Sequence, residues 1–316
     1  MKHITDNCFR AQRPTAVTIG NFDGLHQGHR ALIHTMAQEA EALGLEKTVL
    51  TFSPHPVFLF HQHEISYLIL SPREKAHMME QLGVELYVEQ PFDREFAAQT
   101  PEEFVDRLLV ERLNAKVVVV GENYRFGRKQ SGNAAILKEL CRERGIQMIA
   151  VPAVTYEGER VSSTRVREAL KESNLELANR LLGSPYFILG NVAEGKRLGR
   201  TIGFPTVNIW ADPVKLFPRN GVYATRTLYD GKMYSGVTNV GLNPTVHGTA
   251  KIVETYLFDF QKMIYGEELL TYFFDFIRPE QKFPSVEALQ SMIRQNAQDA
   301  ADYFASPRFD FWREHY

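Results

Sequence analysis

The chain of 316 residues is poor in cysteine and has no long hydrophobic run. Its two cysteines, Cys8 and Cys141, lie far apart in the sequence and offer neither a disulfide framework nor a metal motif. No apolar run reaches the roughly 18 residues that would indicate a transmembrane helix, and the N-terminus lacks a signal-peptide core. The net charge of -2 gives no indication of a nucleic-acid or membrane surface. These absences predict a cytoplasmic protein with neither nucleic acid nor membrane as a partner.

The length exceeds what one hydrophobic core usually supports, which predicts two domains. The hydrophobic content of 44% and the charged content of 23% are ordinary for a globular protein. A helical run at 175–182 is broken by Gly183-Ser184-Pro185, and short strands and turns dominate after it. We therefore expect one domain over residues 1–183 and a second over 187–316.

Apolar runs alternate with amphipathic stretches in the first half. The stretches predicted as helices are 28–43, 71–82, 104–113 and 133–144. The runs predicted as strands are 16–19, 47–52, 84–89, 116–121 and 147–151. This alternation is typical of an α/β domain whose parallel sheet is covered on both faces. Ligands bind beyond the carboxyl ends of such strands, so the residues that follow each strand are the candidates for a site.

The stretch 16–33, AVTIGNFDGLHQGHRALI, joins a buried strand to a helix through a tight turn that starts at Gly20. His26 and His29 lie at the start of the helix. A helix N-terminus presents unpaired N–H groups and the positive end of a dipole, and two imidazoles three residues apart add further donors. The pattern predicts a phosphate-handling site. The alternative is a pair of surface histidines at a helix start.

Two later stretches also follow predicted strands. In 160–167, RVSSTRVR, hydroxyl side chains that can cap a helix stand among arginines, which predicts a second anion site. The alternative there is a capped surface helix. In 121–127, GENYRFG, polar and aromatic side chains alternate, a mixture that can stack on a flat ring and bond its edge, although a packed loop has the same composition. His55, between two prolines, is as well explained by its loop as by a ligand.

The pattern of the second half predicts short strands. They are predicted over 187–192, 221–229, 232–240, 252–260 and 268–277, with a tight hairpin turn at Asp230-Gly231. Several strands at this spacing favour a small antiparallel barrel. Residues 285–304 then form an amphipathic helix that we expect to pack against the barrel.

The stretch 190–208, GNVAEGKRLGRTIGFPTVN, nearly matches a P-loop, but Arg197 replaces the required Ser or Thr, and later glycines and Pro205 prevent the required helix. A basic, glycine-rich loop that can approach phosphates remains. It leads to Thr206 and Asn208, which lie on one face of a strand because they are two residues apart. Such a pair of oxygen ligands can hold Mg²⁺ beside ATP.

The motifs of the two halves resemble one family. Residues 20–29, with the form Gly-x-Phe-Asp-Gly-x-His-x-Gly-His, are similar to the signature of nucleotidyltransferases, and the NFDG variant resembles bacterial FAD synthetases. Residues 199–208, 236–245, 253–260 and 278–283 are similar to the motifs of riboflavin kinases. The whole chain therefore resembles the bacterial bifunctional riboflavin kinase/FAD synthetases (FMN adenylyltransferases). The resemblance implies an α/β nucleotidyltransferase-like domain followed by a small antiparallel β-barrel domain with a C-terminal helix.

The resemblance also implies roles for individual residues. Glu254 is the implied catalytic base of the kinase and His26 and His29 are catalytic in adenylyl transfer, whereas Glu254 in an alternating strand is by itself more often an outward-facing charge. The implied flavin-side residues are Arg278 and Phe283, and the implied metal ligands are Thr206 and Asn208. The implied ATP-binding residues are Gly20, Phe22, Asn123, Arg160, Ser163, Thr164, Arg167, Gly195, Arg200, Thr206 and Asn208.

The implied activity is phosphorylation of riboflavin to FMN followed by adenylyl transfer to FMN, with riboflavin, FMN, FAD and ATP as substrates and products and Mg²⁺ as the cofactor. Tyr256 and Val207 depart from the residues usual in the family, but neither position is assigned chemistry. Two rivals are a nucleotidyltransferase for another phosphorylated substrate, which leaves the second half unused, and a flavin-binding regulatory protein with inactive sites. The sequence does not indicate an oligomeric state.

Overall fold

The computed structural model describes residues 1–60, 67–194, 202–245 and 248–316. These residues form two compact units, each described here by itself. The first unit comprises residues 1–64 and 72–162, and the second comprises 65–71 and 163–316. Residues 163–183, predicted from the sequence to belong with the first half, are thus grouped by their contacts with the second. The functional boundary at 183/187 stays a prediction.

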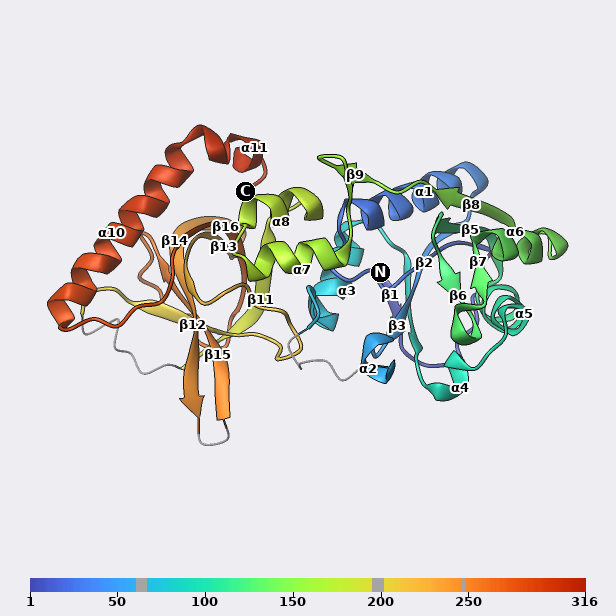
Figure 1. The fold of residues 1–316 in the computed structure, drawn as a ribbon, viewed down its shortest axis with the longest axis horizontal. Coiled ribbons are helices and arrows are strands. Elements are labelled where there is room, and N and C mark those ends of the chain that lie inside the picture. Colours follow the sequence, from blue (N-terminus) through green and yellow to red (C-terminus); the bar gives the residue numbers. More distant parts are fainter. Residues whose placement is uncertain (61–66, 195–201, 246–247) are drawn as a thin grey trace. The chain divides into compact units, whose positions relative to one another are not determined.

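The first unit is a parallel sheet with helices, as the alternating pattern predicts (Figure 1). Its strands in spatial order are β1 (Lys2–Ile4), β4 (Leu86–Pro91), β3 (Glu46–Ser53), β2 (Thr15–Ile19), β5 (Ala115–Gly121) and β8 (Gln147–Val151). Its longer helical segments are α1 (Gln27–Leu43), α3 (Pro72–Gln81), η1 (Val105–Arg112) and α6 (Ala134–Glu143).

Short elements fill the connections of the first unit. They are α2 (Val57–Phe60), α4 (Arg94–Ala97), α5 (Pro101–Phe104), β6 (Arg125–Phe126), η2 (Arg128–Gln130), β7 (Gly132–Asn133), β9 (Thr155–Tyr156) and β10 (Glu159–Arg160). The helix predicted at 104–113 differs in detail from the structure. It begins at Pro101 with a capping box of Thr100 and Glu103, and from Val105 it is wound as a π-helix.

The core of the first unit lies between the sheet and its helices. Every residue of β2 is buried, which is the pattern of a central strand covered on both faces. One cluster joins the apolar side chains of η1 to β2, β3 and β5, and α1 packs against the same three strands. This packing fixes the start of α1 at the carboxyl end of β2, where the sequence predicts a ligand.

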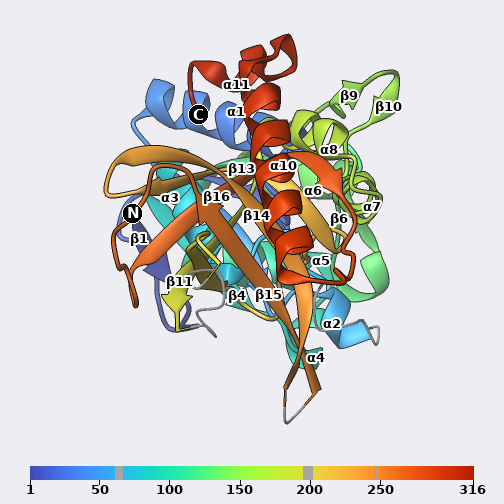
Figure 2. The ribbon, with the colours of Figure 1, turned by 90° about the vertical axis from the view of Figure 1, so that its left-hand side faces the viewer.

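The second unit contains a closed barrel, which confirms the predicted antiparallel β domain (Figure 2). In order around the barrel its strands are β11 (Tyr186–Ala193), β12 (Thr206–Trp210), β15 (Gly248–Leu257), β14 (Lys232–Thr245), β13 (Gly221–Tyr229) and β16 (Glu268–Arg278). The helical segments of this unit are α7 (Ser163–Lys171), α8 (Leu175–Leu182), α10 (Val286–Ala305), η3 (Pro307–Phe309) and α11 (Asp310–Arg313).

Two helices pack on the barrel. α10 contacts β13, β14 and β16, as predicted for the amphipathic helix near the C-terminus. α8 is joined to the barrel by Asn179, whose amide donates to the Phe273 carbonyl (2.9 Å) and accepts from the Tyr186 N–H (2.7 Å). None of the helices in the described parts of the chain is long and apolar enough to span a membrane.

Candidate functional site

His26 and His29 form a stacked pair at the first turn of α1. The His26 side chain caps the helix, because its Nδ1 accepts a hydrogen bond from the His29 N–H (3.3 Å). The two rings are nearly parallel, with centroids 3.7 Å apart. Since Nδ1 of His26 accepts, the proton of its neutral ring lies on Nε2, where it is a donor. The predicted pair of imidazoles at a helix start is therefore present.

His29 is held in its neutral form. Its pKa lies well below the ordinary value, chiefly because of burial and then because of the positive charge that His26 and Lys75 can carry. Its Nδ1 is buried and has no hydrogen-bond partner among the described residues. A neutral imidazole offers one N–H and one lone pair, so His29 contributes a hydrogen bond rather than a full charge.

Two glycines beside the histidines leave little room for a side chain. A side chain at Gly28 would begin 3.2 Å from the His26 ring, and one at Gly20 would begin 3.3 Å from the Phe22 ring. Phe22 is fully buried and meets His29 edge to face, with centroids 5.3 Å apart. Phe22 therefore supports the turn from below, and only its backbone can meet a ligand.

Lys75 is a buried cation beneath the turn that the sequence analysis did not single out. Its Nζ donates to the carbonyl of Asn21 (2.9 Å), which also accepts from the Thr51 hydroxyl (3.2 Å). Burial lowers the pKa of Lys75, while Asp23 and Glu89 oppose that shift. The residue lies in an ordinary helical stretch of α3, and only the tertiary structure brings it under the turn.

Asn123 and Arg160 are exposed in the first unit. Asn123 follows β5, and its Oδ1 lies 3.2 Å from the point where a side chain on Gly121 would begin. Arg160 pairs with Thr155 in the β9–β10 hairpin. The carbonyl of the next residue, Val161, is 4.0 Å from the corresponding point on Gly28. The end of the hairpin therefore lies near the start of α1.

Ser163, Thr164 and Arg167 lie on α7 in the second unit. The Arg167 side chain is held by Tyr67. Its guanidinium carbon lies 4.0 Å from the centre of the Tyr67 ring, and its Nε donates to the Tyr67 carbonyl (3.2 Å).

On the barrel, strand pairing places Asn208 and Glu254 side by side. Asn208 of β12 is directly opposite Glu254 of β15, and Asn239 of β14 is opposite Glu254 on its other side. Directly opposite residues have Cβ atoms about 5 Å apart on the same face of a sheet. Thr206 shares this face because it is two residues from Asn208. The structure thus brings the predicted metal ligands and the predicted base together.

This row lies on the outer face of the barrel. Asn208, Asn239 and Glu254 are partly exposed, whereas Val253 and Thr255, the neighbours of Glu254, are buried inside. The outward position that the sequence alone favoured for Glu254 is therefore what the structure has, and it is compatible with a role at an open face. Asn239 was not assigned a role from the sequence, since only strand register identifies it as a neighbour of Glu254.

The predicted flavin-side residues Arg278 and Phe283 contact one another. The guanidinium carbon of Arg278 lies 5.5 Å from the centre of the Phe283 ring. Its Nε donates to the Asn296 amide oxygen (3.0 Å) and its Nη1 to the Pro279 carbonyl (2.9 Å). Burial lowers the pKa of Arg278 from its ordinary value. A cation and an aromatic ring thus form one local surface beside α10.

The described end of the glycine-rich stretch is fixed against α10 and β15. Phe204 meets Tyr256 edge to face, with centroids 5.4 Å apart, and Arg294 lies over the Phe204 ring at 5.7 Å. The Gln290 amide donates to the Ile202 carbonyl (3.0 Å). Gly195 and Arg200, two predicted ATP-binding residues, lie outside the described residues.

The metal prediction depends on few ligands. The described residues contain no group of three or more His, Cys, Asp or Glu side chains that could hold a metal ion. Thr206 and Asn208 supply neutral oxygen atoms, and Mg²⁺ commonly combines a few protein oxygens with substrate phosphates and water. The pair therefore fits a magnesium ion that enters with a phosphate substrate.

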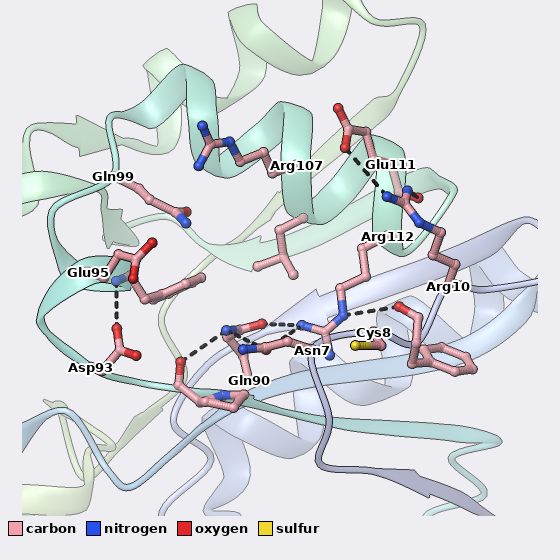
Figure 3. A pocket seen from close by; sticks show the side chains of 14 residues that line it. Asn7, Cys8, Arg10, Gln90, Asp93, Glu95, Gln99, Arg107, Glu111 and Arg112 are labelled. Carbon is pink, nitrogen blue, oxygen red and sulfur yellow. Dashed lines mark hydrogen bonds and ion pairs between the residues drawn. The ribbon is translucent and has the colours of Figure 1, made fainter.

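A separate cavity of about 440 Å³ lies in the first unit (Figure 3). Arg112 lies in its wall. Its guanidinium donates to the Gln90 amide oxygen and to the carbonyls of Asp6 and Phe9. Arg10 and Glu111, on its rim, pair with each other at 4.0 Å. The cavity includes none of the residues predicted from the sequence to form a site.

Two family models match the chain in succession. Residues 8–165 match the model described as FAD synthetase, and residues 182–304 match the model described as riboflavin kinase. Both matches agree with the halves in which the corresponding motifs lie.

Relatives match over nearly the full length. Proteins from Haemophilus influenzae (37% identical, 95% of this chain and 97% of theirs) and Bacillus subtilis (35% identical, 94% and 95%) are named bifunctional riboflavin kinase/FMN adenylyltransferase. The same name is given to an Escherichia coli protein that is 38% identical over 93% of this chain and 94% of its own. A crystal structure described as a macrolide-efflux protein from Streptococcus pneumoniae matches with a TM-score of 0.86 and 31% identity, covering 95% of this chain and 99% of that one.

Proposed function

This chain belongs to the family of bifunctional riboflavin kinase/FMN adenylyltransferases, and we propose that its two reactions use the two groups of residues described above. It phosphorylates riboflavin to FMN with ATP and transfers an adenylyl group from ATP to FMN. In the second reaction an oxygen of the FMN phosphate attacks the α-phosphorus of ATP, and the bond to the departing pyrophosphate breaks.

Adenylyl transfer requires positioning and stabilisation of charge on phosphorus rather than a covalent nucleophile. The stacked pair of His26 and His29 at a helix start supports this role more than any other observation. It places two stacked imidazole rings at the first turn of α1, beside the positive end of the helix dipole. Because burial holds His29 neutral, its hydrogen bond is available at neutral pH without a change of protonation.

The proposed nucleotide contacts of this reaction follow the sequence prediction. The backbone of Gly20 and Phe22 would line the turn, and the buried cation of Lys75 adds positive potential beneath it. The other residues proposed to hold ATP here are Asn123, Arg160, Ser163, Thr164 and Arg167.

For the kinase reaction we propose Glu254 as the base. It would take the proton from the ribityl hydroxyl of riboflavin as that oxygen attacks the γ-phosphorus of ATP and ADP departs. The cross-strand row of Asn208, Glu254 and Asn239 supports this role, because it sets amide groups on both sides of the carboxylate.

Thr206 and Asn208 are proposed to hold Mg²⁺, which would neutralise phosphate charge during transfer. Both are also proposed to contact ATP, together with Gly195 and Arg200 of the glycine-rich stretch. Arg278 and Phe283 are proposed to border the flavin. The cytoplasmic location also stays a prediction from the sequence.

The decisive experiment is a time course with riboflavin, ATP and Mg²⁺, followed by chromatographic separation of the flavins. We expect FMN to form first and FAD to follow. Replacement of Mg²⁺ by a chelator is expected to stop both steps, which tests the metal separately. The absence of any flavin nucleotide would contradict both activities, and FMN without FAD would contradict the proposal for the first unit alone.

A further inference from the structure

Segment 67–70 comes from the first half of the sequence but is bonded to the second unit. The N–H groups of Tyr67 and Leu68 both donate to the Val214 carbonyl, at 3.0 and 2.9 Å. The Leu216 N–H donates back to the Leu68 carbonyl (2.6 Å), and Leu68 and Lys215 form a parallel β-bridge. Segment 67–70 is therefore laid along residues 214–216, which lie between β12 and β13.

Lys215 stabilises this arrangement from a buried position. It is fully buried, and its Nζ donates to the Ile69 carbonyl (2.8 Å). The ammonium group also lies 4.5 Å from the centre of the Tyr186 ring and 5.5 Å from that of Phe187. Burying a cation is costly unless hydrogen bonds and ring faces replace its hydration. Lys215 therefore fixes the position of the Ile69 carbonyl, whereas an apolar residue would only fill the space.

At its first residue, Tyr67, segment 67–70 contacts Arg167 of α7. Tyr67 meets this guanidinium twice, through its ring at 4.0 Å and its carbonyl at 3.2 Å. The Arg167 side chain is 9% exposed, so neighbouring groups restrict its position. A continuous series of contacts thus runs from Lys215, through segment 67–70, to Arg167.

We propose that Lys215 is a positioning residue for adenylyl transfer, because it fixes the segment on which Arg167 rests. A residue of the riboflavin kinase half would then be needed for full activity in the FAD-forming reaction, although it lies outside the FAD synthetase match. This inference rests on the proposed assignment of Arg167 to the phosphates of ATP. Because these contacts order the guanidinium before ATP binds, binding does not have to order it. We therefore expect the loss of Lys215 to act mainly on the KM for ATP.

The test uses the full chain and compares Tyr67→Leu with Tyr67→Phe. Leucine removes the ring face, whereas phenylalanine keeps it. In FAD formation from supplied FMN, we expect Tyr67→Leu to raise the KM for ATP about five- to thirtyfold, the range for a partly buried cation–π contact. Tyr67→Phe should match the parent, and both variants should form FMN from riboflavin at the parent rate.

Lys215→Met tests the other end of the series. Methionine keeps an unbranched apolar chain but removes the charge and the donor to Ile69. We expect the KM for ATP in FAD formation to rise about tenfold, as for the loss of one charged hydrogen bond, with FMN formation retained. Lys232→Met is the matched control, because Lys232 is an exposed lysine of the same half that lies over Tyr234 at 4.8 Å.

Each outcome decides between the inference and its premise. If Arg167→Ala impairs FAD formation but Tyr67→Leu does not, Arg167 serves ATP without support from segment 67–70, and the inference fails alone. If Arg167→Ala leaves FAD formation unchanged, the assignment of Arg167 fails and the inference with it. Equal losses in both reactions, or a kcat effect without a KM effect, would also overturn it. If Lys215→Met does not fold, the Tyr67 pair decides.

Discussion

The two candidate sites differ in how their residues are brought together. In the first unit, one turn and one helix start place Gly20, His26 and His29 within a single short stretch of chain. On the barrel, Asn208, Glu254 and Asn239 come from separate strands and become neighbours only through register. A shift of one residue in either pairing would turn one of these side chains to the other face of the barrel.

The chemistry differs in the same way. His29 is partly buried, desolvation holds its pKa well below the ordinary value, and the buried Lys75 lies nearby. Glu254 stands on a partly exposed strand face between two amides. The first arrangement suits the stabilisation of phosphate charge by fixed donors. The second suits the transfer of a proton from a hydroxyl to a carboxylate. The two sites of this chain therefore assist transfer at phosphorus in different ways. Variants that affect only one of the two reactions separate these ways.

Glu254→Gln should have the largest effect. The amide keeps the shape of the carboxylate but cannot accept the proton of the ribityl hydroxyl, so FMN formation should fall by about 10²–10⁴. FAD formation from supplied FMN should continue, which shows that the variant is folded. Steady-state rates of the two reactions, measured separately, test this. A parent-like rate of riboflavin phosphorylation would leave Glu254 as a surface charge on its strand.

His29→Ala should have the opposite selectivity. Removing one fixed donor from the transition state is expected to lower FAD formation by about 10²–10³, with FMN formation unchanged. The same two assays measure it. Losses of similar size in both reactions would mean that the variant damages the fold or that the two sites are coupled.

Asn239→Ala should have a smaller effect on FMN formation. Loss of an amide beside the carboxylate is expected to cost about tenfold, the equivalent of one hydrogen bond to a charged group. FAD formation should not change. If FMN formation is unaffected, the proximity of Asn239 to Glu254 has no catalytic consequence, and the row reduces to Asn208 and Glu254.

The success of the sequence-based predictions follows this contrast. The fold class was predictable because strand and helix periodicities are local, and so was the placement of His26 and His29 at a helix start. Gly28 illustrates the same point, since its reason is the ring of His26 two residues away. Thr206 and Asn208 were predicted to share a face because the period of a strand is also local.

What escaped sequence reasoning depends on distant parts of the chain. Lys75 lies under the turn at Asn21, Asn239 is set by the pairing of β14 with β15, and Tyr67 lies on Arg167. None of these pairs shares a motif or a period. Their proximity is decided by packing and register, which a single sequence does not reveal.

The smallest expected effect concerns pH and only the first site. Because the pKa of His29 is depressed in the folded chain, the unfolded chain binds a proton at a higher pH than the folded chain does. Folding stability is therefore lost as pH falls below about 6.5, the ordinary histidine value. His29→Gln removes this titrating group. The free energy of unfolding of the variant should therefore fall less steeply than that of the parent as pH decreases, by up to about 1.4 kcal/mol per pH unit.

Urea titrations of parent and variant at several pH values between 5 and 7.5 measure the difference. Parallel curves for parent and His29→Gln would show that His29 titrates alike in the folded and unfolded chains, and the proposed neutral donor would then lose its electrostatic basis.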